Sequence, residues 1–404
     1  MTSDQAGGEL AAALARITLE QLDDDPYPVY AWLREHAPVA WIPAVGLWLV
    51  TTWAAVEAAA TDAETFSAGV TPSPLERTMG EGNILLIDGP RQKRLRQALD
   101  PSLRPRQVER NAVPLIAPLV DGYLERIEGR GQADLMAEYF EPISVRSLAL
   151  VLGIAEIDDD TLRRWFAEMA IGATNFEGDA EKDRIGMGAS AEVDERLQPI
   201  MRRMLAEPDG STISNMLQEA DGSFEERLAW IMPTIKIIIT GGMQEPGHAG
   251  GSTVFGLLAN PEQSVALAAD PAALVRPAVE EGLRWISPIG TQTRRATRAT
   301  TLAGVAVPAG ANLGLLVSAA NRDPLAWGED AEQYDLYRAK RPHGGFGFGT
   351  HFCPGHHLSR VQMHLAIEAL YERCRNLRFD PDQRSQLRGW EFRAPTHLHV
   401  RWDR

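Results

Sequence analysis

The stretch GFGFGTHFCPGHH, residues 345–357, decides how the rest of the sequence is interpreted. It places Cys353 among glycines, phenylalanines and histidines, and the chain contains only one other cysteine, Cys374. A solitary cysteine in such a setting is either a packing residue or a ligand, because its reactivity depends on its surroundings. The residues around Cys353 therefore decide between a packing role and a ligand role.

Three interpretations of Cys353 fit its neighbours. The thiol can act as a small buried apolar group in a glycine-rich loop. It can join His351, His356 and His357 in a zinc site, although structural zinc sites usually contain paired cysteines at short spacing and Cys374 is distant. It can also be the single thiolate ligand of a haem iron.

The haem interpretation accounts for more of the loop. Pro354 and Gly355 precede a helical pattern at 357–374, so the sulfur lies near a helix N-terminus, whose partial positive charge stabilises a thiolate. Glycines permit tight turns that bring N–H groups to the sulfur, and Phe346 and Phe352 can shield it from water. A thiolate ligand favours O–O bond cleavage at haem iron.

Composition restricts the remaining possibilities. The chain has 404 residues, of which 44% are hydrophobic and 24% charged, as in a globular protein, and its net charge of −15 disfavours nonspecific nucleic-acid binding. Two cysteines cannot form a disulfide framework, and the N-terminal residues lack a signal-peptide pattern. The most apolar run, 231–242, contains Pro233 and Lys236 and is too short to span a bilayer. We expect a cytoplasmic protein without a membrane segment.

The hydrophobic pattern predicts a mainly α protein with a small β region. Helical periodicity dominates from about 104 to 290, and another helix follows Pro28. Residues 39–52 predict a hairpin that turns at 44–46, and short strands are expected within 301–318. No repeat or linker interrupts the chain. We therefore predict one domain over 1–404, with β-rich subregions at about 30–70 and 290–345 and a helical remainder.

The pattern F-G-F-G-T-H-F-C-P-G, from Phe346 to Gly355, closely resembles the haem-binding loop of the cytochrome P450 family. The resemblance implies the cytochrome P450 fold, with haem b between a central helix and the cysteine loop. It also implies that the Cys353 thiolate ligates the iron and that Phe346, Gly347 and Gly355 contact the haem.

Further family features occur in the expected order. Glu281-Gly-Leu-Arg284 resembles the E-x-x-R pair of the family, and Arg338 matches the third member of its buried ion network. A Glu–Arg pair three residues apart on a solvated helix is the ordinary alternative. By resemblance, the network fixes the loop that presents the thiolate.

The resemblance also assigns partners to the haem propionates. Gln92 departs from the histidine that is usual in the family, which implies a neutral or missing contact at that position. Arg295 competes with Arg294 for one of these roles, because the segment 289–293 aligns ambiguously. The matching positions are Gln92, Arg96, Arg294 and His351.

The segment ITGGMQEPGHAGG, 239–251, departs most from the family, whose central helix usually carries an acid followed by an alcohol here. This chain has Gln244 and Glu245, followed by Pro246. Within the resemblance, the Glu245 carboxyl faces the haem and delivers protons, provided that an apolar pocket raises its pKa. Pro246 is expected to open the helix locally. Outside the resemblance, a Gln–Glu pair is usually a polar surface couple.

Several segments, among them MQEPGH and the C-terminal FRAPTHLHVRW, resemble bacterial guaiacol-type aromatic O-demethylases. That similarity implies oxidation of a methoxy carbon on a small phenol, giving a hemiacetal that collapses to a catechol and formaldehyde. Where these enzymes have an aromatic cage, this chain has Met79, Ala173 and Phe392, so we expect an enlarged pocket and a bulkier substrate such as a 4-alkylguaiacol. The predicted substrate pocket is completed by Gly241, Gly242 and Ile289.

The chain has no flavin, nicotinamide or iron–sulfur signature, so electrons come from a separate partner. The subgroup resemblance implies an NADH-dependent reductase with flavin and an iron–sulfur centre. A basic face at 91–110 is its predicted docking surface, although a solvated helix explains the same charges. The face contains Arg91, Lys93, Arg94, Arg96, Arg104, Arg106 and Arg110 against Asp100 and Glu109.

Three functions remain open at this stage. A reductase-driven monooxygenase using O2 is favoured. A peroxide-driven peroxygenase that uses Glu245 as acid and base is the second, and a haem-binding sensor without turnover is the third.

Overall fold

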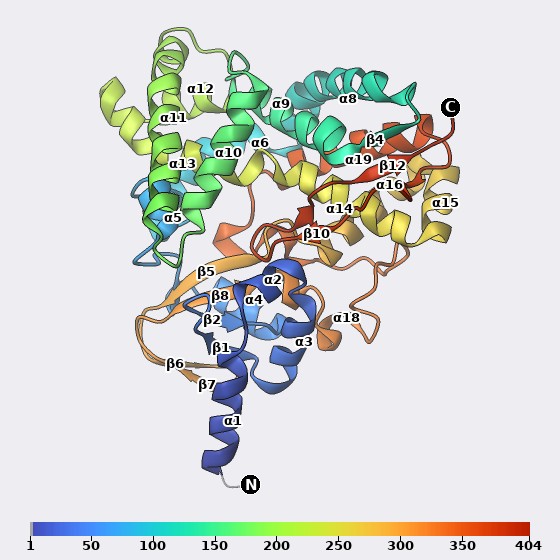
Figure 1. The fold of residues 1–404 in the computed structure, drawn as a ribbon. Helices are drawn as coiled ribbons and strands as arrows, with labels where there is room; N and C mark the ends of the chain where they lie inside the picture. The colour runs from blue at the N-terminus through green and yellow to red at the C-terminus, as the bar shows by residue number, and fades with distance from the viewer. Residues whose placement is uncertain (1–2) are drawn as a thin grey trace.

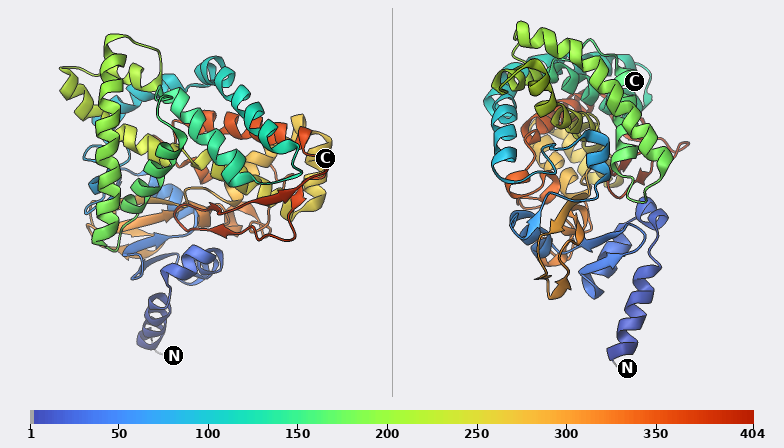
Figure 2. Two further views of the ribbon diagram at one scale, coloured as in Figure 1. Left: turned by 45° about the horizontal axis from the view of Figure 1, so that its top comes forward. Right: turned by 90° about the vertical axis from the view of Figure 1, so that its left-hand side faces the viewer.

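The computed structural model describes residues 3–404, and helices make up most of it (Figure 1). The helices lie in layers in the upper part of the view, and the largest sheet lies below them. Helix α1, Ser3–Ala15, projects from the sheet region in all three views (Figure 2). The prediction of a mainly α chain with a small β region is confirmed.

The helices surround a central one, α14, which packs against α9, α16 and α19. In chain order the helices are α1 (Ser3–Ala15), α2 (Leu19–Asp24), α3 (Tyr27–His36), α4 (Trp53–Thr61), α5 (Pro74–Met79), α6 (Gly89–Leu103), α7 (Pro105–Gln107), α8 (Val113–Glu128), α9 (Glu141–Leu152), α10 (Asp159–Ala173), α11 (Ala180–Ala206), α12 (Thr212–Glu219), α13 (Phe224–Gly242), α14 (Glu245–Ala259), α15 (Pro261–Ala269), α16 (Pro271–Trp285), α17 (Val317–Ala320), α18 (Pro324–Trp327) and α19 (His356–Arg373). Short π turns occur at Val108–Ala112 and Met136–Phe140, and 3-10 turns at Gly344–Phe346 and Gly349–His351.

The main sheet has the strand order β1-β2-β8-β5-β3. Its strands are β1 (Val39–Ile42), β2 (Leu47–Val50), β3 (Phe66–Ser67), β5 (Thr291–Ala296) and β8 (Asn312–Leu316). Strands β1 and β2 form the predicted hairpin, with Ile42 opposite Leu47, and Gly46 in the turn has a φ of 66° that glycine adopts without steric cost. The sheet holds together distant segments of the chain, because β2 pairs with β8 in parallel, with Trp48 opposite Leu313.

The remaining strands form three small sheets, and they correct the predicted β-rich subregions. Strands β6 (Thr300–Leu302) and β7 (Val305–Val307) fall within 290–345 as expected. Strand β4 (Gln132–Asp134) and the C-terminal strands fall in the part that was predicted to be helical. These C-terminal strands are β9 (Arg378–Phe379), β10 (Leu387–Arg388), β11 (Ala394–Pro395) and β12 (His399–Arg401). They are too short to produce a readable alternation of polar and apolar residues.

Helix α14 is buried on nearly every side, which requires small residues where other elements cross it. A Cβ at Gly250 would lie 2.8 Å from the Phe140 ring, and one at Gly247 would lie 2.8 Å from the Phe140 carbonyl oxygen. Glycine therefore allows the turn at Met136–Phe140 to approach the helix closely.

The chain breaks between α13 and α14, close to the predicted position. Helix α13 ends at Gly242, and α14 begins at Glu245 with Gln244 as its N-cap residue. Pro246 lies in the first turn of α14, where an N–H has no intrahelical acceptor, so it begins a helix instead of disrupting one. The break places Glu245 at a helix start in the middle of the protein.

The largest hydrophobic core lies among the helices, and two smaller ones cover the sheet. Within residues 3–404, every helix falls short of the length and apolar character needed to cross a membrane.

Candidate functional site

A cavity of about 350 Å³ lies between α14, the start of α19 and the loop that contains Cys353. Much of its wall is aliphatic, with leucines from α6, α9 and α16. Most of the residues predicted for the site line it: Gln92, Arg96, Ala173, Gly241, Gly242, Glu245, Ile289, Arg294, Phe346, Gly347, His351, Cys353, Gly355 and Phe392.

The backbone of its loop holds Cys353 at the cavity wall. The Cys353 N–H donates to the carbonyl oxygen of Phe346 at 2.8 Å, which closes the loop on itself. Gly347 has a φ of 77°, in the left-handed region that favours glycine. Helix α19 begins at His356 with Gly355 as N-cap, so the thiol precedes a helix N-terminus, as predicted.

Burial in the cavity wall favours the neutral form of the Cys353 thiol. Burial raises the pKa of Cys353, whereas the N–H of Gly355 and the guanidinium groups of Arg96 and Arg360 act in the opposite direction. A metal cation deprotonates a thiol that coordinates it. Cys353 is therefore suited to become a thiolate when a cation binds.

The histidines near Cys353 are engaged elsewhere, which argues against the zinc interpretation. His351 Nε2 lies 2.9 Å from Asp88 Oδ1, and His357 Nε2 lies 3.1 Å from Glu109 Oε1. His356 Nδ1 lies 3.0 Å from Arg360 Nη1. Among the described residues, the group of side chains that is arranged to hold a metal ion does not include Cys353.

Two polar residues of α6 bind the cysteine loop. Gln92 Nε2 donates to the Thr350 carbonyl oxygen at 2.8 Å, and Arg96 Nη1 donates to the Phe352 carbonyl oxygen at 2.6 Å. Both side chains also line the cavity. Gln92 thus has a role here that a neutral amide can fill, namely support of the loop.

The carboxylate of Asp88 orients His351. Burial alone would raise the pKa of Asp88, but hydrogen bonds from His351, Ser67 and the Ala68 N–H lower it to about 2. The ionised carboxylate accepts the His351 Nε2–H bond, which leaves Nδ1 as the free ring nitrogen.

Arg294, and not Arg295, faces the cavity. The Arg294 side chain is buried, and its Nη1 donates to the Thr293 carbonyl oxygen at 2.7 Å while Nη2 has no partner among the described residues. Burial lowers the pKa of Arg294, and Asp88 opposes that shift. Arg295 instead donates to the Thr71 carbonyl oxygen at 3.3 Å on the outside. A buried guanidinium with an unused N–H indicates that an anionic group belongs in the cavity.

Glu281, Arg284 and Arg338 form a buried ion network. Arg284 Nη2 lies 2.6 Å from Glu281 Oε1, and Arg338 Nε lies 3.1 Å from the same oxygen. Arg284 is 1% exposed and also donates to the carbonyl oxygens of Asn321, Ala331 and Gln333 at 2.7–2.8 Å.

The network connects to the cysteine loop through Asn321. The Asn321 carbonyl oxygen accepts from Arg284, and the Asn321 side-chain oxygen accepts the Gly344 N–H at 2.8 Å. Gly344 begins the turn that leads to Phe346, whose carbonyl oxygen binds the Cys353 N–H. A continuous series of hydrogen bonds therefore links α16 to the loop that positions the sulfur.

Glu245 is a buried carboxyl without a partner. Both of its oxygens lack a hydrogen bond within the described residues, and burial raises its pKa to about 8. The side chain lines the cavity, as does Cys353. Gln244, which we predicted to act with Glu245, is the N-cap residue of α14 and does not line the cavity.

The apolar side of the cavity includes Ala173, Ile289 and Phe392. Phe392 is held by a β-bridge to Ile289 and by an edge-to-face contact with Phe166 at 6.3 Å. Met79 was predicted here, but it does not line the cavity. It is fully buried under Thr240, whose hydroxyl lies 3.7 Å from the Met79 sulfur.

Comparisons with known proteins agree with this geometry. The family model described as "Cytochrome P450" matches residues 273–389. Cytochrome P450 130 of Mycobacterium tuberculosis is 30% identical over 365 residues, which cover 87% of this chain and 88% of its own. The vitamin D(3) 25-hydroxylase of Pseudonocardia autotrophica is 30% identical over 368 residues, which cover 86% of each chain. This chain belongs to the cytochrome P450 family.

Other cytochromes P450 are similar over nearly the whole chain. The 6-deoxyerythronolide B hydroxylase of Saccharopolyspora erythraea is 29% identical over 94% of this chain and 96% of its own. The solved structure of P450BioI with a fatty-acyl carrier protein has a TM-score of 0.86, with 25% identity over 95% of this chain and 100% of its own. These proteins act on varied substrates, and none of them is named as a guaiacol O-demethylase.

Cytochromes P450 bind haem b through a cysteine thiolate on the iron, and the residues of this cavity fit that group. Cys353 supplies the sulfur donor, and the unpartnered Nη2 of buried Arg294 is available to donate to a propionate. Arg96 is another candidate for a propionate contact, as is His351 when Nδ1 also carries a proton, while Phe346, Gly347 and Gly355 shape the wall around the sulfur.

Replacing Arg294 by leucine is expected to weaken haem retention by about tenfold to a hundredfold, the equivalent of a lost hydrogen bond to a charged group of about 1.5–3 kcal/mol. Arg295→Leu is the matched control, because it removes the neighbouring arginine from the outer face of the same strand. Haem transfer to apomyoglobin measures both rates. Equal rates of haem loss in the two variants would show that Arg294 has no propionate role.

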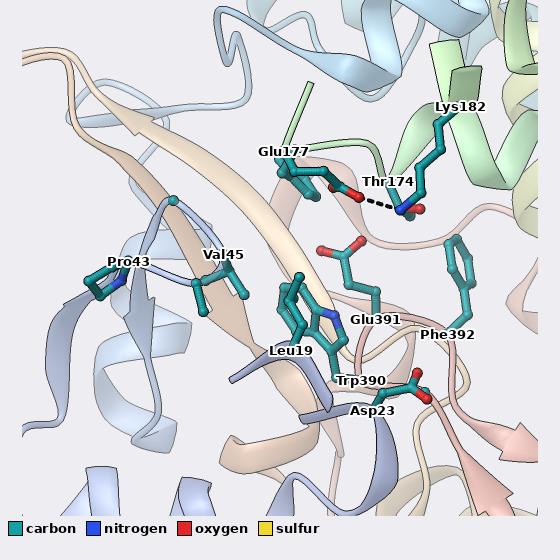
Figure 3. A pocket seen from close by; sticks show the side chains of 14 residues that line it. Leu19, Asp23, Pro43, Val45, Thr174, Glu177, Lys182, Trp390, Glu391 and Phe392 are labelled. Carbon is teal, nitrogen blue, oxygen red and sulfur yellow. Dashed lines mark hydrogen bonds and ion pairs between the residues drawn. The ribbon is translucent and has the colours of Figure 1, made fainter. Parts of the chain in front are cut away.

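One residue of this cytochrome P450 was not foreseen. Glu391 lines both the central cavity and a second, outer pocket of about 440 Å³ (Figure 3). In that view its carboxylate lies between the ion pair of Glu177 with Lys182 and the ring of Trp390. Burial raises the pKa of Glu391 to about 8. Its position directly before Phe392 was the available signal.

Proposed function

We propose that this cytochrome P450 removes the methyl group from a methoxylated phenol of the guaiacol or 4-alkylguaiacol type. The observation that carries the proposal is the apolar recess formed by Ala173, Ile289 and Phe392 in the same cavity as Glu245 and Cys353. The Phe392 ring, which Phe166 contacts edge to face at 6.3 Å, offers an aromatic surface to a substrate ring.

The reaction consumes O2, two electrons and two protons for each methoxy group. Haem, when bound, supplies the activation of O2 that inserts one oxygen atom into a methyl C–H bond. The resulting hemiacetal breaks its C–O bond to give a catechol and formaldehyde, and the second oxygen atom leaves as water.

The residues of the chain orient the ring and control protons. The β-bridge between Ile289 and Phe392 holds one wall of the recess in place. Ala173 has only a methyl side chain at a position where a phenylalanine would fill more of the cavity. The space left by the smaller side chain supports a 4-alkyl group on the ring.

The proposal is tested by comparing guaiacol, 4-propylguaiacol and 4-propylphenol. We expect the two guaiacols to shift the haem absorption band and to release formaldehyde, with tighter binding of 4-propylguaiacol. 4-Propylphenol is the control, since it fits the recess but has no methoxy group. If none of a panel of methoxylated phenols releases formaldehyde, the proposed reaction is wrong; substrate-dependent spectral shifts alone would instead indicate a sensor.

Glu245 is proposed as the proton donor near the reacting oxygen. Glu245→Gln is expected to lower product formed per NADH on the order of 100-fold, a typical contribution of a positioned acid, while substrate affinity stays within about twofold. Because the carboxyl holds its proton below a pKa of about 8, the wild-type rate should fall as pH rises above that value. The variant should lack this alkaline limb.

The matched control for Glu245→Gln is Gln244→Ala, at the neighbouring position outside the cavity. Its coupling and pH profile should resemble those of the wild type. If Gln244→Ala reduces coupling as much as Glu245→Gln does, the two residues act together and the separate role of Glu245 is refuted.

A peroxide-driven reaction is the second candidate function. The unpartnered, proton-bearing carboxyl of Glu245 favours it, because such a group can move a proton between the two oxygens of hydrogen peroxide. Product formed with hydrogen peroxide alone, at a rate comparable to that with NADH and reductase, would support this function.

The proposed electron donor is a separate NADH-dependent reductase with flavin and an iron–sulfur centre, which docks on the basic face at 91–110. Lys93 and Arg104 are exposed on this face, whereas Arg94 pairs with Asp221. The double variant Lys93→Gln and Arg104→Gln should raise the KM for the reductase severalfold and weaken its salt dependence.

Arg202→Gln with Arg203→Gln, on exposed positions of α11, is the control for docking. It removes the same charge from another helix and should leave the KM unchanged. Identical salt dependence in the wild type and both double variants would exclude docking on the basic face.

A further inference from the structure

Asp134, His397 and His399 gather on the surface of the small sheet formed by β4, β12 and β9. One possible ligand atom of each lies within 4.8 Å of those of the other two. The antiparallel pairing of β12 with β4 sets this arrangement, because it places His399 directly opposite Asp134. His397 lies two residues earlier, so the alternation of side chains along an extended segment brings both imidazoles to one face.

The carboxylate of Asp134 is held in place before any ligand arrives. Its Oδ1 accepts the N–H groups of Leu398 at 2.9 Å and Met136 at 3.1 Å, and its Oδ2 lies 2.6 Å from His397 Nδ1. The Asp134 side chain is only 13% exposed, whereas that of His397 is 58% exposed. Backbone N–H groups therefore fix the Asp134 carboxylate on its buried side, while the adjacent His397 ring is accessible to solvent.

The second imidazole distinguishes this cluster from an ordinary ion pair. The rings of His397 and His399 stack at 5.2 Å with an interplanar angle of 10°. Within residues 3–404, His397 has Asp134 as a partner, but the ring of His399 makes no hydrogen bond. An ion pair between Asp134 and His397 does not require His399 beside it, whereas a metal ion uses both rings.

We propose that Asp134, His397 and His399 bind one divalent transition-metal ion, with zinc as the reference ion. Two imidazoles and a carboxylate are donors that zinc accepts, and water completes the coordination when a site has three protein ligands. None of the three residues lines the haem cavity, so the site is separate from the catalytic one.

The bound ion connects β4 to β12. Residues after Asp134 lead to Phe140, whose ring packs against Gly250 of α14, and residues before His397 lead to Phe392 in the cavity wall. An ion that bridges the two strands therefore stabilises the folded chain around the cavity. It binds the native state, in which the three ligands are together, and not the unfolded state, in which they are apart.

The test uses untagged holoenzyme, in which haem occupies Cys353, after removal of adventitious metal with a chelator. We expect titration calorimetry with Zn2+ to give about one equivalent per chain at micromolar concentrations, and the thermal midpoint to rise with Zn2+ but not with Mg2+. In His399→Gln and Asp134→Asn, zinc affinity should fall by at least about tenfold, because a ligand is lost.

His36→Gln is the matched control. His36 is also exposed, stacks on an aromatic ring, Trp32, at 4.8 Å and lies 3.9 Å from a carboxylate, Glu35, but it has no second imidazole. The His36→Gln variant should bind zinc with the wild-type affinity. The proposal is overturned if the wild type takes up no zinc, if Mg2+ binds as well as Zn2+, or if His399→Gln retains the wild-type affinity.

Discussion

Replacing Arg284 by leucine is expected to lower the free energy of unfolding by about 3–5 kcal/mol, the usual cost of leaving a buried charge without its partner. Arg284 is 1% exposed and lies 2.6 Å from Glu281, which would remain as a buried carboxylate with only Arg338 beside it. Three backbone carbonyl oxygens would also lose their donor. Chemical denaturation followed by circular dichroism measures the change.

The chain contains a closely matched control for Arg284→Leu. Glu181 and Arg184 on α11 form a Glu–Arg pair at the same three-residue spacing, but their side chains are 62% and 70% exposed. Arg184→Leu should cost far less than Arg284→Leu, because solvent screens an exposed ion pair. Similar losses in the two variants would show that the Glu281 network contributes no more than a surface pair.

Loss of Arg284 should also disturb the haem. The hydrogen bonds from Arg284 through Asn321 to Gly344 lead into the turn that holds Cys353. We therefore expect Arg284→Leu to retain less haem than Arg184→Leu at equal fractions of folded protein. If the folded Arg284→Leu protein binds haem normally, the network supports the fold but not the loop.

Replacing Cys353 by alanine is expected to abolish NADH-driven product formation, reducing it to the background of free haem. The substitution removes the sulfur at the cavity wall but leaves the loop intact, because the loop is closed by the backbone bond from residue 353 to Phe346. A thiolate favours O–O cleavage at haem iron, and no other ligand at this position does so as well. Formaldehyde release from 4-propylguaiacol measures the loss.

Cys374→Ala is the control for Cys353→Ala, because it removes the other thiol, which is buried in the helical core away from the cavity. It should retain haem and near wild-type turnover per haem. Undiminished turnover in Cys353→Ala would rule out this cysteine as the ligand, whatever the result for Cys374→Ala.

The sequence predicted those parts of the site whose signals are local. The loop around Cys353 is short, contiguous and shaped by glycines, so its sequence pattern can be recognised without knowledge of the fold. The break near Pro246 was predictable for the same reason, since proline restricts its own neighbours. The fold class followed from long stretches of helical periodicity.

Direction of side chains was harder to predict. Arg294 and Arg295 are adjacent, and only the register of β5 on β8 decides which one faces the cavity. Met79 and Gln244 were assigned by aligned position alone, but neither lines the cavity: Met79 packs under Thr240, and Gln244 is the N-cap residue of α14.

Contacts between distant segments were predictable only where the family resemblance supplied them, as it did for Glu281 with Arg338. Asp134 and His399 become neighbours only because β4 pairs with β12. Glu391 becomes a cavity residue only because the segment before β11 folds back toward Ile289. Short strands carry too little pattern to reveal such pairings in advance.

The central claim, that the Cys353 sulfur is the protein ligand of a haem iron, is tested most directly by X-ray absorption at the iron K-edge. The wild-type holoprotein is predicted to show one sulfur neighbour in addition to the porphyrin nitrogens, and that sulfur should disappear in Cys353→Ala. An iron environment of nitrogen and oxygen alone in the wild type, or a sulfur neighbour that persists in Cys353→Ala, would contradict the claim.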